Sequence, residues 1–126
     1  MQWHQWINQA FKCPFILGSG QTEMTPVTTV FHDKWSYKDG NYWGEALTTT
    51  DQAVMDDNGV ILPDGEIGEI VWRSPSAINS YYKDPEATAE VSTFGWHHSG
   101  DLGYFDEDHQ LMFVDRKKDM IKTGGE

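Results

Sequence analysis

The chain has 126 residues, enough for one domain with a modest hydrophobic core and too few for a two-domain enzyme that closes over a large substrate. Its 20 Asp and Glu residues against 9 Lys and Arg give a formal net charge of -11, and such a surface repels nucleic acids and anionic membranes. A lone cysteine, Cys13, excludes an internal disulfide framework, and no apolar run reaches membrane-spanning length. We therefore expect a cytoplasmic protein with no transmembrane segment and no nucleic-acid partner.

The first 26 residues have the pattern of a helix followed by a buried strand. Apolar side chains recur at helical spacing over residues 2–11, which predicts an amphipathic helix. Residues 13–17 are continuously apolar and end at a glycine-rich turn, as in strands buried on both faces of a parallel sheet. Because no second unit of this kind follows, residues 1–26 are predicted to be a remnant of an α/β subdomain.

Residues 27–114 carry short β-rich runs separated by turn signals at residues 38–41, 57–59, 63–65 and 106–109. This pattern predicts a mainly β subdomain with short helices, either a small distorted antiparallel β-barrel or a pair of sheets.

Two hairpins, one strand and one helix are predicted within the β region. Asn58-Gly59 suits a tight turn between residues 53–55 and 60–62, and a second hairpin joins residues 102–105 to 111–114. Residues 66–73 form another predicted strand. Asp84 followed by Pro85 predicts a helix start, because the carboxylate caps free amides and proline fits the first turn.

The segment Gly18-Ser19-Gly20-Gln21-Thr22-Glu23 is a glycine-rich turn at the carboxyl end of the predicted buried strand, where open α/β sheets bind ligands. Its amides and the Thr22 hydroxyl are suited to phosphate oxygens, and Glu23 is suited to a Mg²⁺ ion that bridges phosphates. Taken alone, such a glycine-rich stretch is more often a flexible connector.

The loop at residues 95–103 delivers one carboxylate, Asp101, just before a strand. A fixed carboxylate can accept two hydrogen bonds from a vicinal diol such as ribose, but this stretch taken alone favours a simple turn cap. His97 and His98 are adjacent on an extended loop and lack a ligand partner at metal-binding spacing, so we do not predict a metal site there. The acidic turn at residues 106–108 lacks the ligand ladder of a calcium loop.

Residues 114–126 run from a strand through a charged link, Asp115-Arg116-Lys117-Lys118, to a glycine pair. On its own this segment is typical of a solvated charged turn. The position of this segment after the stretches at residues 20–26 and 95–103 is more informative about function than its composition.

Taken together, these stretches resemble the adenylate-forming superfamily of acyl-CoA synthetases, luciferases and peptide-synthetase adenylation domains. Residues 20–26, GQTEMTP, are similar to the threonine-glutamate motif of that family. Residues 68–75 and 81–88 resemble its GEIxxRGP and GYxxxPEAT stretches. Residues 95–103, GWHHSGDLG, and 114–121, VDRKKDMI, resemble its GW-to-GDxG loop and its DRxKDxI link, so the resemblance covers nearly the whole chain.

The resemblance implies where this chain lies in a larger enzyme. In the family, the DRxKDxI link is the hinge between a large amino-terminal domain and a small mobile carboxyl-terminal domain. We therefore interpret residues 1–114 as the end of the large domain and residues 115–126 as the hinge and truncated start of the small domain. The family joins a carboxylate to the α-phosphate of ATP, expels pyrophosphate, and then forms a thioester, usually with coenzyme A.

The resemblance also implies site roles. Gly20, Gln21 and Thr22 would contact the nucleotide, with Thr22 on the α-phosphate, and Glu23 would hold Mg²⁺. Asp101 and Arg116 would contact the ribose. The other implied roles are the hinge pivot at Lys118 and the coenzyme A channel loop at Lys122, Gly124 and Gly125.

Two features limit the activity expected of this chain. Ser19 stands where the family often has an aromatic residue against adenine. The family's phosphate loop and its carboxyl-terminal catalytic lysine have no counterpart here, so we expect no turnover by this polypeptide alone. The motifs favour a fatty-acid–CoA ligase fragment, and a peptide-synthetase adenylation fragment is the enzymatic alternative.

A non-catalytic β module that binds sugars or proteins is the alternative of another class. The six tryptophans of the chain are compatible with a sugar- or protein-binding face, although tryptophan more often packs in the core. We also expect residues 2–17 to self-associate, as a dimer or a swapped arrangement, or to be disordered, because their apolar side chains lack a covering sheet.

Overall fold

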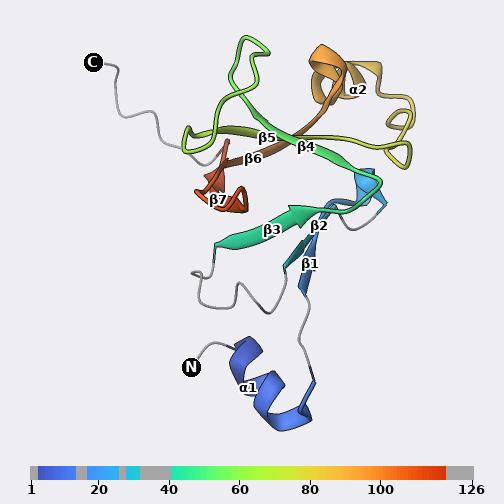
Figure 1. The fold of residues 1–126 in the computed structure, drawn as a ribbon. Coiled ribbons are helices and arrows are strands. Elements are labelled where there is room, and N and C mark those ends of the chain that lie inside the picture. The colour runs from blue at the N-terminus through green and yellow to red at the C-terminus, as the bar shows by residue number, and fades with distance from the viewer. Residues whose placement is uncertain (1–2, 14–16, 26–27, 32–40, 119–126) are drawn as a thin grey trace.

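The structure is a computed structural model, and it describes residues 3–13, 17–25, 28–31 and 41–118. Seven strands form one antiparallel sheet in the order β1-β2-β3-β7-β6-β5-β4 (Figure 1). The strands are β1 (Leu17–Ser19), β2 (Thr29–Phe31), β3 (Tyr42–Ala46), β4 (Asp51–Met55), β5 (Gly68–Arg73), β6 (His97–Phe105) and β7 (Leu111–Arg116). The helices are α1 (Trp3–Phe11), α2 (Pro85–Val91) and two single turns of 3₁₀ helix, η1 (Thr22–Met24) and η3 (Thr93–Gly95).

The mainly β prediction is confirmed, and the sheet is open. The outermost described strands, β1 and β4, each have one neighbour in the sheet, so the sheet does not close into a barrel. Of the strand predicted at residues 13–17, only Leu17 belongs to a strand that the structure describes. Residues 14–16 lie outside the described part of the chain, and β1, which begins at Leu17, pairs antiparallel with β2.

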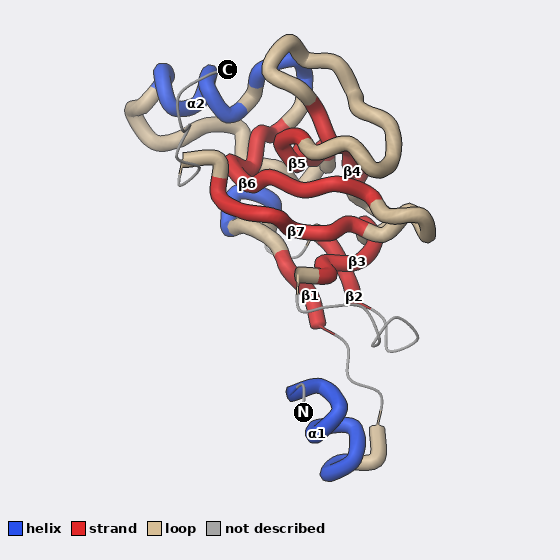
Figure 2. Tube along the Cα trace, turned by 90° about the vertical axis from the view of Figure 1, so that its left-hand side faces the viewer, coloured by secondary structure: helices blue, strands red, loops and turns tan. Residues whose placement is uncertain are grey.

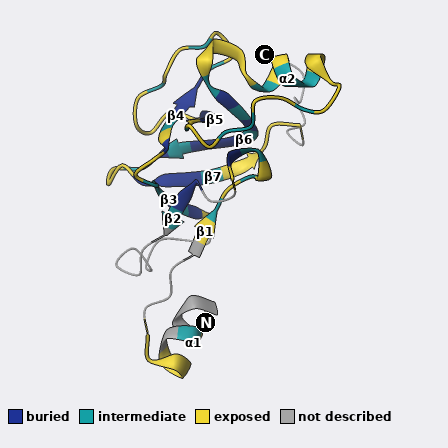
Figure 3. Ribbon diagram, turned by 90° about the vertical axis from the view of Figure 1, so that its right-hand side faces the viewer, coloured by how far each residue is buried: buried dark blue, intermediate teal, exposed yellow. Residues whose placement is uncertain are grey.

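The core lies on and between the central strands. Its main cluster consists of Met24, Val54, Ile70, Trp72, Phe105 and Leu111, all less than a tenth exposed. Five consecutive residues of β5, Gly68 to Trp72, are buried, and Glu69 is the charged residue among them. Figure 3 shows the buried residues gathered on β5, β6 and β7, whereas α2 is largely exposed.

The predicted local features of the β region are mostly confirmed. Strands β6 and β7 form the predicted hairpin, and Asp106 Oδ1 accepts hydrogen bonds from two amides of its turn. Asp84 Oδ1 accepts a 3.0 Å hydrogen bond from Ala87 N at the start of α2, as predicted.

The Asn58-Gly59 turn forms, with Gly59 at a φ of 83°, but its second arm is not a strand. Ile61 makes an isolated bridge to Met55, and the second arm is held to the first by hydrogen bonds from Asp56 N to Val60 O and from Leu62 N to Val54 O.

The amino-terminal helix is confirmed as α1. Figures 1 and 2 show it apart from the sheet, at the end opposite α2. Trp6 is 51% exposed and Phe11 68% exposed, so these two side chains of α1 are not covered by the described sheet. None of the helices in the described ranges is both long and apolar enough to cross a membrane.

Candidate functional site

Segments far apart in the sequence meet around one hollow of about 380 Å³. The η1 turn, the start of β6 and the end of β7 contribute most of its walls. Its lining residues are Gly20, Gln21, Thr22, Glu23, Tyr81, Val91, His97, His98, Ser99 and Arg116. Five residues that the sequence singled out for nucleotide contact therefore line one cavity, and a sixth, Asp101, contacts two of them.

The threonine-glutamate turn is fixed by the residue that follows it. Met24 is only 1% exposed and belongs to the main core cluster. Its amide donates a 3.0 Å hydrogen bond to Gln21 O, which closes the 3₁₀ turn. The buried Met24 side chain anchors the turn in the core. The two residues before it line the hollow, where the Thr22 side chain is exposed and that of Glu23 is half-buried.

Asp101 and Arg116 are partners in the β6–β7 ladder. Arg116 Nε lies 3.0 Å from Asp101 Oδ1, with the Asp101 side chain 3% exposed and that of Arg116 64% exposed. The approach does not have hydrogen-bond geometry, and Asp101 Oδ1 accepts no hydrogen bond from the residues that the structure describes. Burial raises the pKa of Asp101, and the charge of Arg116 and the Gln21 amide only partly oppose it.

Gln21 joins the turn to β6. Its Nε2 donates to Ser99 O at 2.8 Å and approaches Asp101 Oδ2 at 3.4 Å. Its Oε1 lies 3.1 Å from His97 Nε2. Burial lowers the pKa of His97, so the neutral imidazole is favoured, and its Nε2–H then donates to Gln21.

Glu23 has a side-chain partner that the sequence analysis did not assign. The Tyr81 hydroxyl donates to Glu23 Oε1 at 2.8 Å. The pKa of Glu23 is lowered by its own backbone amide and by Tyr81. Tyr81 stands in the stretch that resembles GYxxxPEAT, and that motif was the only sequence signal for it.

A second cluster, also unassigned by the sequence analysis, surrounds Glu69. Its side chain is 9% exposed, and its Oε2 lies 3.0 Å from His98 Nδ1 and 2.9 Å from Lys117 Nζ. Gly100 N donates to the other oxygen at 3.0 Å. Burial acts to raise the pKa of Glu69, but the hydrogen bonds from Lys117, His98 and Gly100 outweigh it and lower the pKa.

The Glu69 cluster borders a hollow of about 620 Å³ that Lys118 also lines. Lys117 Nζ contacts Asp57 as well, at 2.8 Å, and Lys117 N donates to Gly100 O at 2.8 Å. The predicted pivot residue, Lys118, therefore directly follows a residue that is tied to the sheet. Lys122, Gly124 and Gly125 lie outside the described residues, so their predicted roles have no structural test here.

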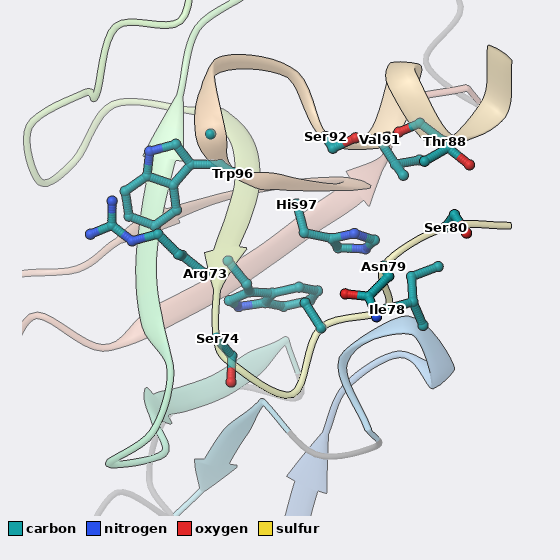
Figure 4. Close-up of a pocket in the computed structure, with 13 residues that line it drawn as sticks. Arg73, Ser74, Ile78, Asn79, Ser80, Thr88, Val91, Ser92, Trp96 and His97 are labelled. Atoms are coloured by element: carbon teal, nitrogen blue, oxygen red, sulfur yellow. Dashed lines mark hydrogen bonds between the residues drawn. The ribbon is translucent and has the colours of Figure 1, made fainter. Parts of the chain in front are cut away.

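A third hollow, of about 300 Å³, lies beside the first (Figure 4). Its walls come from β5, the following loop, α2 and the start of β6, and His97 lines both hollows. The Arg73 guanidinium lies 4.5 Å from the centre of the Trp96 ring and bonds Asp51. The lining of this hollow is mainly apolar. Its charged lining residue, Arg73, is paired with Asp51.

Comparison with known proteins places the chain in a family. Residues 1–82 match the AMP-binding enzyme family, so the chain belongs to that family. A long-chain-fatty-acid–CoA ligase of Salmonella typhimurium is 38% identical over 108 residues, which are 86% of this chain and 19% of the relative. A feruloyl-CoA synthase of an Amycolatopsis species is 40% identical over 112 residues, 89% of this chain and 23% of the relative.

Solved structures agree with this assignment. O-succinylbenzoate coenzyme A synthetase from Bacillus subtilis, in complex with ATP and magnesium, matches with a TM-score of 0.83 and 28% identity over 94% of this chain and 25% of its own. The amide bond synthetase McbA from Marinactinospora thermotolerans matches with a TM-score of 0.77 and 33% identity, over 84% and 22% of the two chains. The chain thus spans about a fifth to a quarter of the length of these proteins.

Proposed function

We propose that the chain is part of an ATP-dependent acyl-CoA ligase and that the hollow beside η1 is its nucleotide site. One observation carries the proposal: the Thr22-Glu23 turn and Arg116, far apart along the chain, line a single cavity, and Asp101 contacts Arg116. Membership of the AMP-binding family supports the same function. The roles of individual residues are part of the proposal.

The site residues fit the two ends of a nucleotide. The buried Asp101 Oδ1, which accepts no hydrogen bond from the described residues, is suited to a ribose hydroxyl donor. The exposed Thr22 hydroxyl would donate to the α-phosphate, and the amides around Gly20 and Gln21 would support it. Arg116 would balance charge beside the sugar.

Glu23 would hold the Mg²⁺ ion. Its lowered pKa keeps it ionised at neutral pH, as a metal-binding carboxylate requires. Bound Mg²⁺ would supply neutralisation of phosphate charge, and the chain's own residues would orient the nucleotide and hold it.

The domain arrangement is proposed from the same family membership. Residues 1–26 and 27–114 would be the last parts of a large domain, and residues 115–126 the hinge and the beginning of a small one. Lys118 would be the pivot. Lys122, Gly124 and Gly125 would approach the coenzyme A channel after the pivot turns.

A fatty acid is the proposed carboxylate, because the motifs and a fatty-acid–CoA ligase relative agree. The proposed compartment is the cytoplasm, which suits an exposed free cysteine. A peptide-synthetase adenylation domain remains the enzymatic alternative.

The β binding module finds less support, because three of the tryptophans pack within the fold. Trp72 is fully buried, Trp43 stacks on Phe113 at 4.8 Å, and Trp96 lies under Arg73.

Calorimetric titration of the chain with AMP tests the proposed site. Asp101→Asn is expected to weaken AMP binding about tenfold or more, because a hydrogen bond to a charged group is lost. Glu107→Gln, at an exposed turn, should leave binding unchanged. Equal affinities of the wild-type chain and Asp101→Asn would contradict the assignment of the ribose site.

A further inference from the structure

Tyr81 and Thr88 belong to a stretch, residues 81–88, for which the proposed function has no role. Tyr81 lies 58 residues from Glu23 in the sequence, yet its hydroxyl donates to Glu23 Oε1 at 2.8 Å. Burial and the neighbouring Glu23 carboxylate raise the pKa of Tyr81. The phenol therefore stays protonated and acts as the donor, which favours the ionised form of Glu23.

Tyr81 is itself held in place by the start of α2. Its backbone amide donates to Thr88 Oγ1 at 2.9 Å, and Thr88 Oγ1 donates to Asp84 O at 2.7 Å. Asp84 in turn caps α2. The Thr88 hydroxyl thus links the backbone of Tyr81 to the first turn of the helix.

The loop before Tyr81 also contacts the threonine-glutamate turn through the backbone. Ile78 N donates to Glu23 O at 2.7 Å. Ser76 Oγ donates to Met24 O at 3.1 Å. The main chain of the turn is therefore held independently of Tyr81, so loss of the Tyr81 hydroxyl should release the Glu23 side chain without displacing the turn.

Tyr82 provides a contrast within the same motif. Its side chain is 87% exposed and lines none of the described hollows around Glu23. Of these two adjacent tyrosines, Tyr81 contacts the Glu23 carboxylate, and Tyr82 therefore serves as its control.

We propose that Tyr81 is a positioning residue that orients the Glu23 carboxylate toward the hollow and that α2, through Thr88, sets the position of Tyr81. The inference rests on the proposed function, because Glu23 is assigned there as the carboxylate that meets the nucleotide-bound cation. It gives the GYxxxPEAT-like stretch a role at the site through Tyr81, which lines the same hollow.

The test uses the full chain and two readouts. The pKa of Glu23 is measured from its carboxyl carbon shift in the wild-type chain, Tyr81→Phe and the control Tyr82→Phe. Affinity for Mn²⁺–ATP is measured in the same proteins from paramagnetic broadening. Tyr81→Phe should raise the Glu23 pKa toward its ordinary value and weaken Mn²⁺–ATP binding about threefold to tenfold, whereas Tyr82→Phe should change neither.

Thr88 variants test the second part of the proposal and guard against misfolding of Tyr81→Phe. Thr88→Val should shift the Glu23 pKa in the same direction, and Thr88→Ser, which keeps the hydroxyl, should restore it. An unchanged Glu23 pKa in Tyr81→Phe and Thr88→Val would overturn the inference. Absence of Mn²⁺–ATP binding by the wild-type chain would instead contradict the proposed function, while the pKa comparison would still decide the role of Tyr81.

Discussion

Asp101 Oδ1 lies 3.0 Å from Arg116 Nε across the β6–β7 ladder, and no described residue donates a hydrogen bond to it. A buried carboxylate with an unfilled acceptor is unfavourable for the empty protein and favourable for a ligand that brings a hydroxyl donor. The pair therefore combines a cost in stability with a capacity for recognition, and the two effects can be separated by mutation.

Asp101→Asn should lose nucleotide affinity without losing stability. The pKa of Asp101 is raised above its ordinary 3.8 by burial, so its ionisation opposes folding as pH rises through that value, and the effect is complete above the folded-state pKa. At pH 7 the variant should be as stable as the wild type or more stable by about 1 kcal/mol. The difference should vanish near pH 3. Thermal denaturation across this range measures it, and a large loss at pH 7 would contradict the account.

Glu69→Gln should destabilise the fold, because Glu69 receives hydrogen bonds from Gly100 N, Lys117 and His98. The expected loss is about 1–3 kcal/mol at pH 7. The pKa of Glu69 is lowered from 4.5, so its contribution is present above that value and is lost as pH falls through the folded-state pKa. Urea unfolding at pH 7 and pH 3 measures both.

The control for this prediction is Glu66→Gln, at an exposed residue close by in the sequence. It should change the free energy of unfolding by no more than about 0.5 kcal/mol. If both variants behave alike, the hydrogen bonds to Glu69 do not stabilise the fold.

The chain alone should catalyse neither half-reaction. It spans 19% of the fatty-acid–CoA ligase relative, and the family's phosphate loop has no counterpart in its sequence. A coupled pyrophosphate assay with ATP, Mg²⁺ and medium- or long-chain fatty acids should give no signal above the protein-free blank. Turnover would refute this expectation.

The chain should self-associate through its amino-terminal segment. Trp6 and Phe11 of α1 are both more than half exposed. Exposed aromatic side chains on one helix are favourable contacts for a second copy. Sedimentation velocity should show a concentration-dependent dimer, weakened by Phe11→Ser. A sharp monomer at all concentrations would contradict the prediction.

Features with local causes could be predicted from the sequence. The Asp84 cap and the turn at Asp106 depend on atoms within a few residues, so their spacing reveals them. Sheet order could not be predicted in this way. The pairing of β3 with β7 joins residues about 70 positions apart, and only the complete packing selects it.

The candidate site likewise has residues that the sequence could identify and contacts that it could not. The motifs identified Thr22, Glu23, Asp101 and Arg116, and the structure brings them together. They gave no indication that Tyr81 bonds Glu23, or that Glu69 bonds Lys117, because each pair is separated by 48 or more residues. Such side-chain contacts have no periodic signal in a single sequence.

Mapping of amide and side-chain NMR shifts during titration with ATP and Mg²⁺ tests the central claim most directly. The account predicts saturable changes with one shared dissociation constant at Thr22, Glu23, Asp101 and Arg116, with small changes at the exposed turn around Glu107. Shifts confined to one of these segments, or different constants at the η1 turn and at the β6–β7 pair, would contradict a single shared nucleotide site.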